Sequence, residues 1–305
     1  MEKHRRTRRP EATIALLLNG TLTMVRSDAR PNVDYGPGEV ARENEILRGL
    51  VGSTLHGTAL DGQDDRDEMG ISIEPPAYAL GLHAVDVHNG STDDSFTRYV
   101  FRTQPEGARS GPGDTDLVIY SLRRWLSLAV SGNPSVLLLF WVPDDALIVR
   151  TEEGDRLRAL APAVVSQQAG ERFLRYLRNQ AERMDGLGRR NRVPNRPELV
   201  AAHGYDTKYA AQALRLGLQG FELMTTGRLS LPMRDEDREQ VMAIRRGDVD
   251  KATAREMIDM VARDLADLLD SPDLPASSPL PLRPDLDAVN DYLAQAHRRA
   301  WGWAA

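Results

Sequence analysis

Apolar residues recur at steps of three and four along most of the second half of the chain, which is the spacing of one helix face. This pattern predicts a series of amphipathic helices joined by short polar or glycine-containing connections. The last of them is expected to turn a row of apolar side chains inward. The predicted helices are Glu171–Met184, a helix that follows Tyr205, Asp235–Arg246, Val249–Asp270 and Asp285–Trp301, the last with Leu286, Val289, Tyr292, Leu293 and Ala296 facing the core.

The helix after Tyr205 carries two neighbouring stripes of side chains. One stripe is apolar and predicts a side that faces the core, whereas the other is polar and lies beside it at the same spacing. The apolar stripe consists of Ala211, Leu214, Leu218 and Phe221, and the polar stripe of Lys208, Gln212, Arg215 and Gln219. A polar stripe beside a core stripe suits a helix that lines a cleft. An exposed polar face is the plainer alternative.

The first half of the chain alternates between turn residues and short β-prone runs. Residues 19–40 are rich in Gly, Pro, Asn and Asp, and the stretch from Asn32 to Gly38 is predicted to be a loop. Ser121 is a good N-cap for a helix over Leu122–Ser131. The other expected elements are a short strand or helix at Ile14–Leu18, a helix over Glu39–Leu47, and strands at Leu47–Val51, Thr97–Thr103, the run after Asp116, Val136–Val142 and Leu229–Pro232.

Composition sets the broad class of protein. The chain has 305 residues, 41% of them hydrophobic, which is normal for a soluble globular protein of one large or two ordinary domains. It has no cysteine, so disulfides, thiolate zinc sites and a cysteine nucleophile are excluded, and a cytoplasmic location is the simpler expectation. No segment approaches the length of about 20 apolar residues that a membrane span needs. The composition leaves the oligomeric state open.

The charge distribution indicates possible binding partners only in local regions of the chain. The net charge of −6 argues against a broad electrostatic grip on nucleic acid, although a local basic groove is compatible with it. Arginines cluster around the loop Gly188–Pro197, where they either meet a nucleic acid or are simply solvated. For Arg102 and Arg109, a surface position is favoured over contact with phosphates. His56 lacks a second histidine at ligand spacing, so a packing role is favoured over catalysis.

The strongest chemical signal lies in residues 52–71. Gly52 and Ser53 open this stretch, and Asp65 and Asp67 close it against an apolar segment. If the chain is extended there, the period of two places both carboxylates on one face. Magnesium prefers carboxylate oxygens together with substrate phosphates, so an acid pair beside a glycine turn suggests a metal–triphosphate site. A lone Asp-x-Asp, however, is common in solvated loops.

A third acid is expected after the glycine-rich residues 109–113. Asp114 and Asp116 would share one face of a strand, so periodicity alone leaves both as candidates.

Several of these motifs together resemble a known family. The Gly-Ser followed about ten residues later by Asp-x-Asp is similar to the signature of the DNA polymerase β superfamily of nucleotidyltransferases. A more specific resemblance is to the RNA-ligase-associated (RlaP-like) nucleotidyltransferases of bacteria and phages. It rests on residues 116–124, on Gly132-Asn133-Pro134, and on residues 203–216 with 222–227, and it covers roughly residues 47–245. Asp64 stands where the family usually has Ser, and Gln212 where it often has His.

The resemblance implies an α+β fold, with a polymerase-β-type core of mixed sheet and flanking helices followed by a mainly helical domain. It accounts for two of five expected segments, a catalytic core 39–160 and a helical domain 161–270 lining the active site. Composition and periodicity predict the other three, which are a partly disordered N-terminal segment 1–38, a stiff Pro-rich linker 271–284 and a C-terminal helix 285–305.

The resemblance also implies a function, the transfer of NMP from an NTP to an acceptor hydroxyl with release of pyrophosphate. It implies Mg²⁺ or Mn²⁺ as cofactor, held by Asp65 and Asp67, and it selects Asp116 over Asp114 as the third, catalytic ligand. Gly52 and Ser53 would cradle the phosphates, and Lys208 and Arg215 would neutralise triphosphate charge. An RNA end is the first expectation for the acceptor, before a protein side chain or a small molecule. A non-catalytic nucleotide-binding regulator and a metal-dependent phosphodiesterase are the alternatives.

Overall fold

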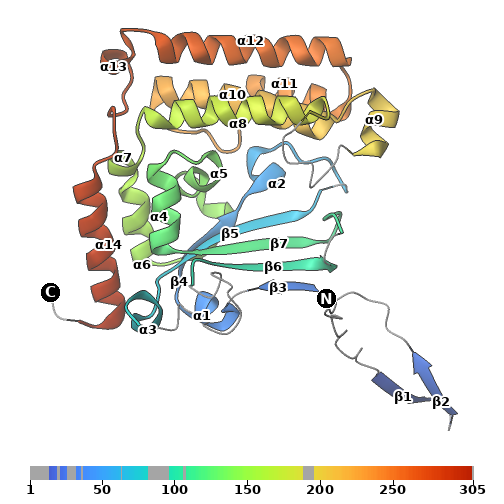
Figure 1. Cartoon of the computed structure of the whole chain (residues 1–305), viewed down its shortest axis with the longest axis vertical. Coiled ribbons are helices and arrows are strands. Elements are labelled where there is room, and N and C mark those ends of the chain that lie inside the picture. Colours follow the sequence, from blue (N-terminus) through green and yellow to red (C-terminus); the bar gives the residue numbers. More distant parts are fainter. Residues whose placement is uncertain are drawn as a thin grey trace, which may run out of the picture.

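A six-stranded mixed sheet lies at the centre of the computed structural model (Figure 1). The structure describes residues 14–18, 21–25, 32–35, 37–62, 64–81, 96–105, 108–187 and 196–303. Strands β5 and β7 are parallel neighbours in the middle of the sheet, and all other pairs are antiparallel. In sheet order the strands are β3 (Asn32–Tyr35), β6 (Arg98–Pro105), β7 (Thr115–Ser121), β5 (Arg66–Ser72), β4 (Glu45–Leu50) and β8 (Leu147–Arg150). Strands β1 (Ile14–Leu18) and β2 (Thr21–Val25) pair only with each other.

Helices cover both faces of the central sheet. On one face, the short helix α1 (Gly38–Glu43) packs on β6 and β7, and Tyr99, Leu117 and Ile119 form a small core with it. On the other face, Ile71 of β5 packs in the main core with Trp125. The helices of this second face are α2 (Gly52–His56), α4 (Leu122–Val130), α5 (Pro134–Leu137) and α6 (Glu152–Ala159), followed by α7 (Ala161–Val164).

A layer of long helices lies beyond this second face (Figure 1). Its centre is α10, which packs on α8, α11 and α12. Gly217 and Gly220 allow the close approach, because a Cβ at Gly217 would lie 2.6 Å from Val261 Cγ1 and one at Gly220 would lie 2.8 Å from Phe173 Cβ. The helices are α8 (Gln168–Met184), α9 (Pro197–His203), α10 (Thr207–Thr226), α11 (Asp235–Arg246), α12 (Lys251–Asp270) and the short α13 (Leu274–Ser277).

The last helix, α14 (Leu286–Trp301), returns to the sheet and lies beside α4 and α7. His297 Nε2 lies 3.0 Å from a carboxylate oxygen of Glu74, and Trp301 Nε1 donates to the Glu74 carbonyl at 2.9 Å. One continuous core therefore runs from the sheet through the helical layer to α14. The α+β expectation is confirmed, whereas the division at residue 160 into domains stays a prediction.

Five local predictions were wrong. The helix predicted over Glu39–Leu47 ends at Glu43, and Glu45–Leu47 belong to strand β4. Asn32–Tyr35 forms edge strand β3 and not a loop. Within the strand predicted over Val136–Val142, residues 136–140 are helical and no strand forms, because Asn133 accepts a hydrogen bond from Ser135 N and Pro134 occupies the first turn of α5. Leu229–Pro232 forms no strand, although Leu229 is buried. Phe221 and Leu286 are 38% and 53% exposed, so neither belongs to the core face predicted for its helix.

Other predictions agree with the structure or fall outside it. Strand β6, the Ser121 cap of α4, and helices α8, α10, α11, α12 and α14 appear close to their predicted bounds. Within the predicted linker, Leu280 packs in the main core. The segment 1–13 and residues 188–195 of the basic loop lie outside the described residues. Among the described helices, none combines the length and apolar character that a membrane crossing requires.

The contrast between Leu214 and Phe221 on α10 can be tested by alanine substitution. Leu214 is 1% exposed in the main core, so Leu214→Ala is expected to lower the free energy of unfolding by about 2–4 kcal/mol. Phe221→Ala removes a larger side chain from a more exposed position and is expected to cost less than about 1 kcal/mol. Urea denaturation of both variants measures the two free energies of unfolding. A larger decrease for Phe221→Ala than for Leu214→Ala would show that the core face of α10 is assigned incorrectly.

Candidate active site

Three carboxylates meet at the end of the sheet where β5 and β7 begin. The parallel register places Asp67 of β5 directly beside Asp116 of β7, and Asp65 immediately precedes β5. One carboxylate oxygen from each of Asp65, Asp67 and Asp116 lies within 4.8 Å of the others. Three hard oxygen donors at this spacing fit a divalent cation such as Mg²⁺ or Mn²⁺.

The turn that opens helix α2 is packed against this acidic group. Gly52 has φ +68°, a conformation that favours glycine, and a Cβ on Gly52 would overlap a carboxylate oxygen of Asp67. Val51 N donates to the Asp67 carbonyl at 2.9 Å and ties the turn to β5. Glycine is therefore required at residue 52, and it brings Ser53 to the edge of the acids.

The three acids strain one another electrostatically. Burial, and then repulsion from Asp65 and Asp116, raises the pKa of Asp67 to about 7, against an ordinary value of 3.8. Lys208 acts in the opposite direction and lowers the pKa of the same group. A bound cation would favour the ionised form of Asp67.

Asp116 and Asp114 have different surroundings, because Asp116 lies in β7 whereas Asp114 precedes it. Asp116 accepts hydrogen bonds from Gln104 Nε2 at 2.8 Å and from Ser110 Oγ at 2.9 Å. Asp114 instead accepts from Gly111 N and from Thr103 Oγ1, each at 2.9 Å, and so closes the local turn. The structure brings Asp116 to Asp65 and Asp67, and it leaves Asp114 outside that group.

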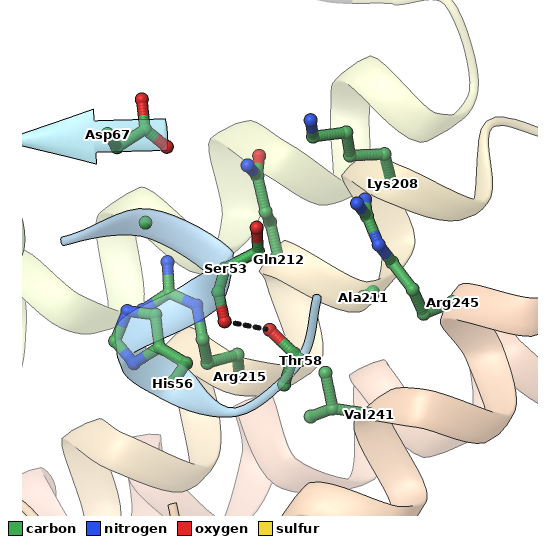
Figure 2. A pocket seen from close by; sticks show the side chains of 11 residues that line it. Ser53, His56, Thr58, Asp67, Lys208, Ala211, Gln212, Arg215, Val241 and Arg245 are labelled. Atoms are coloured by element: carbon green, nitrogen blue, oxygen red, sulfur yellow. Dashed lines mark hydrogen bonds between the residues drawn. The ribbon is translucent and has the colours of Figure 1, made fainter. Parts of the chain in front are cut away.

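A pocket lies between the acids and the helical layer (Figure 2). Asp67 stands on its sheet side, and helices α10 and α11 supply cationic side chains on the other side. Gly52, Ser53, Lys208 and Arg215, which were singled out from the sequence, all line it. The remaining lining residues are His56, Thr58, Asp67, Ala211, Gln212, Val241 and Arg245.

Arg215 is a partly buried cation at this pocket. Its Nη1 donates to Gln219 Oε1 at 2.8 Å, and Gln219 Nε2 lies 3.2 Å from His56 Nδ1. Burial lowers the pKa of Arg215 to about 10, so the guanidinium remains charged at neutral pH. Burial, and then the charge of Arg215, holds the pKa of His56 well below its usual value. His56 is thus a buried, neutral packing partner, and among the described residues no carboxylate forms an ion pair with Arg215.

Arg245 is a pocket residue that the sequence analysis missed. Arg245 Nη2 and Lys208 Nζ both contact Asp64 Oδ1, the latter at 3.6 Å. Leu60 N donates to Asp64 Oδ2 at 2.6 Å. Burial alone would raise the pKa of Asp64, but the Leu60 hydrogen bond and Arg245 outweigh it and lower that pKa. In the sequence Arg245 is only one of two arginines that end a helix, which is an ordinary pattern.

The remaining arginines lie at the margins of the site. Arg102 Nε is 3.8 Å from Asp116 Oδ2, and Arg109 Nη1 is 3.5 Å from Glu198. Arg196, at the end of the basic loop, donates through its backbone N to Asp206, the buried N-cap of α10. This arginine therefore helps to fix the start of the helix that carries Lys208.

A sequence model of one protein family, described as the RlaP RNA repair pathway DNA polymerase beta family, matches residues 39–295. The chain belongs to this family. The match runs from α1 into α14 and includes the acidic group, the glycine turn and the cationic side chains of α10 and α11. No curated protein and no solved structure matches the chain. Membership in the RlaP family confirms the resemblance found in the sequence and indicates a nucleotidyltransferase.

The raised pKa of Asp67 predicts how stability depends on pH when no divalent cation is bound. Because the folded-state pKa of about 7 exceeds the ordinary 3.8, the folded protein binds more protons than the unfolded chain between those values. The free energy of unfolding should therefore fall as pH rises through this window, with a contribution on the order of 2–4 kcal/mol from Asp67.

Urea denaturation with a chelator between pH 5 and 8.5 measures this contribution. Asp67→Asn should be more stable than the parent protein at pH 8 and should show a flatter pH profile. If the free energy of unfolding of Asp67→Asn depended on pH as steeply as that of the parent protein, Asp67 would not be the group with the raised pKa.

Proposed function

We propose that this RlaP-family protein transfers NMP from a nucleoside triphosphate to an acceptor hydroxyl and releases pyrophosphate. The observation that carries the proposal is the position of the acidic group directly beside a pocket lined with cations. Acids suited to a divalent cation on one side, and guanidinium and ammonium groups on the other, match the two needs of a triphosphate–metal complex.

The cation would be Mg²⁺ or Mn²⁺, held by Asp65, Asp67 and Asp116. Two observations support this fit: the carboxylate oxygens lie at ligand spacing, and repulsion raises the pKa of Asp67, which a bound cation would relieve. When bound, such an ion activates the attacking hydroxyl and offsets the charge that develops on the phosphate oxygens.

Asp116 is assigned to the acceptor side of the reaction. Gln104 and Ser110 hold its carboxylate from the side of β6, so its orientation is fixed before the substrate arrives. A fixed carboxylate at that position would orient the acceptor hydroxyl and accept its proton, while the hydroxyl oxygen bonds to the α-phosphorus and the bond from that phosphorus to the pyrophosphate oxygen breaks.

Gly52, Ser53, Lys208 and Arg215 are assigned to the triphosphate. Gly52 and Ser53 line the pocket wall next to Asp67, where the turn would bind phosphate oxygens. Arg215 is the stronger of the two cationic candidates, because its partly buried charge has no carboxylate partner among the described residues. A phosphate oxygen would supply the missing counter-charge.

An RNA end is the proposed acceptor. The family description places its members in an RNA repair pathway, and RNA termini offer the required hydroxyl. With a net charge of −6, RNA would be held by local contacts close to the acids and not by the whole surface. A protein side chain or a small molecule is tested alongside RNA.

The experiment is incubation with each NTP labelled at the α-phosphate, Mg²⁺, and either RNA with a free 3′-hydroxyl, cell protein or small molecules. Label that becomes attached to RNA, with release of pyrophosphate, supports the full proposal. Label attached to protein moves the acceptor but retains the reaction. Hydrolysis alone would indicate a phosphodiesterase, and binding without turnover a regulatory protein.

The metal ligands can be tested by isosteric substitution. Asp65→Asn, Asp67→Asn and Asp116→Asn should each reduce transfer at least about 100-fold while the protein stays folded, because volume is kept and like-charge repulsion is relieved. Asp114→Asn is the matched control and should be milder, since Asp114 serves the local turn. If Asp114→Asn abolished transfer and Asp116→Asn did not, the third ligand would be misassigned.

The phosphate contacts can be tested by binding. Lys208→Ala and Arg215→Ala should each weaken the binding of a nonhydrolysable NTP by roughly 1.5–3 kcal/mol, because charge-assisted hydrogen bonds are lost. Binding of NMP should hardly change, and neither should the preference among the four bases. Exposed Arg228 provides the control substitution. Equal affinity of all variants for the NTP would remove α10 from the active site.

A further inference from the structure

Arg245 is an incompletely satisfied buried cation at the pocket. Its side chain is only 9% exposed, it lines the pocket together with Lys208, and one of its terminal nitrogens contacts Asp64. Its Nε, in contrast, is buried without a hydrogen-bond acceptor among the described residues. A guanidinium offers five N–H donors, so the carboxylate leaves most of them available. Figure 2 shows the guanidinium of Arg245 close to Lys208.

Asp64 lies behind these cations and not in the pocket itself. Its side chain is 5% exposed, and it is absent from the residues that line the pocket. One carboxylate oxygen serves both Arg245 and Lys208, while the other accepts the hydrogen bond from Leu60 N. The carboxylate is thus fixed to the backbone of the turn that leads directly into Asp65.

We propose that Arg245 is a third cation for the triphosphate and that Asp64 is the positioning residue that holds Arg245 and Lys208 toward it. This inference rests on the proposed function and extends it to two residues. Lys208 and Arg245 come from different helices, α10 and α11, and repel each other at close range. A shared, buried carboxylate offsets that repulsion and fixes the ammonium and the guanidinium group without occupying the pocket.

The direction in which Asp64→Asn changes triphosphate affinity distinguishes two roles for Asp64: positioning of the two cations, or simple repulsion of the phosphates. If Asp64 only opposed the phosphates as a negative charge, Asp64→Asn would strengthen triphosphate binding. If Asp64 holds the two cations in place, the same change weakens binding, because the cations lose their common anchor. The asparagine can still accept from Leu60 N, so the turn is retained in both cases.

The probes are inorganic tripolyphosphate, a nonhydrolysable NTP and NMP, each titrated by calorimetry with Mg²⁺. Arg245→Met and Asp64→Asn should each weaken tripolyphosphate and NTP binding about tenfold or more and leave NMP binding unchanged. A general loss of structure would weaken NMP binding as well. The controls are Arg246→Met, an exposed neighbour paired with Asp248, and Asp61→Asn, in the exposed part of the same turn.

The double variant Asp64→Asn/Arg245→Met tests whether Asp64 acts through the cations. In the Arg245→Met background, Asp64→Asn should weaken tripolyphosphate binding by less than it does in the unmodified protein, because one of the two cations that Asp64 positions is then absent. The double variant also avoids an unpaired buried charge at Arg245. If Asp64→Asn does not melt cooperatively, Asp64→Ser serves as a second test of whether loss of the carboxylate weakens or strengthens binding. Fully additive losses, or tighter binding by Asp64→Asn, would overturn the positioning role.

The outcomes also separate this inference from the function on which it rests. If the unmodified protein binds neither tripolyphosphate nor NTP, the proposed function fails, and the inference fails with it. If the unmodified protein binds both, but Arg245→Met behaves like Arg246→Met, only the role of Arg245 and Asp64 is overturned.

Discussion

Repulsion among three carboxylates is the interaction on which the rest of this structure depends. Strands β5 and β7 are parallel, and their register sets Asp67 beside Asp116, with Asp65 at the point where β5 begins. The sheet thus holds negative charges closer together than they would stay in a flexible chain, and burial adds to the cost. The folded sheet bears this unfavourable energy, and a bound cation would offset it.

The helical layer supplies the opposite charge without cancelling the acids. Helix α10 is brought close to its neighbours by Gly217 and Gly220. Three members of its polar stripe, Lys208, Gln212 and Arg215, line the pocket together with Arg245 of α11. Arg215 keeps its charge although it is partly buried, and within the described part of the chain the one carboxylate that pairs with Lys208 and Arg245 is Asp64. Acids and cations therefore face each other across a pocket, an arrangement suited to a ligand that carries metal and phosphate together.

The sequence predicted those parts of the site that depend on local spacing. Asp65 and Asp67 share a short extended segment, and the stripe from Lys208 to Arg215 follows one helix, so both could be found from periodicity. The choice of Asp116 over Asp114 depends on which residue lies opposite Asp67 in a neighbouring strand, and residue spacing does not contain that register. Arg245 was missed because its approach to Asp64 joins positions 181 residues apart. Residues 136–142 were taken for a strand because a short buried apolar run fits either element, and the Asn133-Pro134 helix start was the overlooked signal.

The central claim is that one site holds a divalent cation and a triphosphate between the sheet and the helical layer. Its most direct test is a crystal structure with Mn²⁺ and a nonhydrolysable NTP, in which anomalous scattering locates the metal. A manganese peak is expected within coordination distance of Asp65, Asp67 and Asp116, with the β- and γ-phosphates against Lys208 and Arg215. A metal bound elsewhere, or a nucleotide whose phosphates point away from α10, would contradict it.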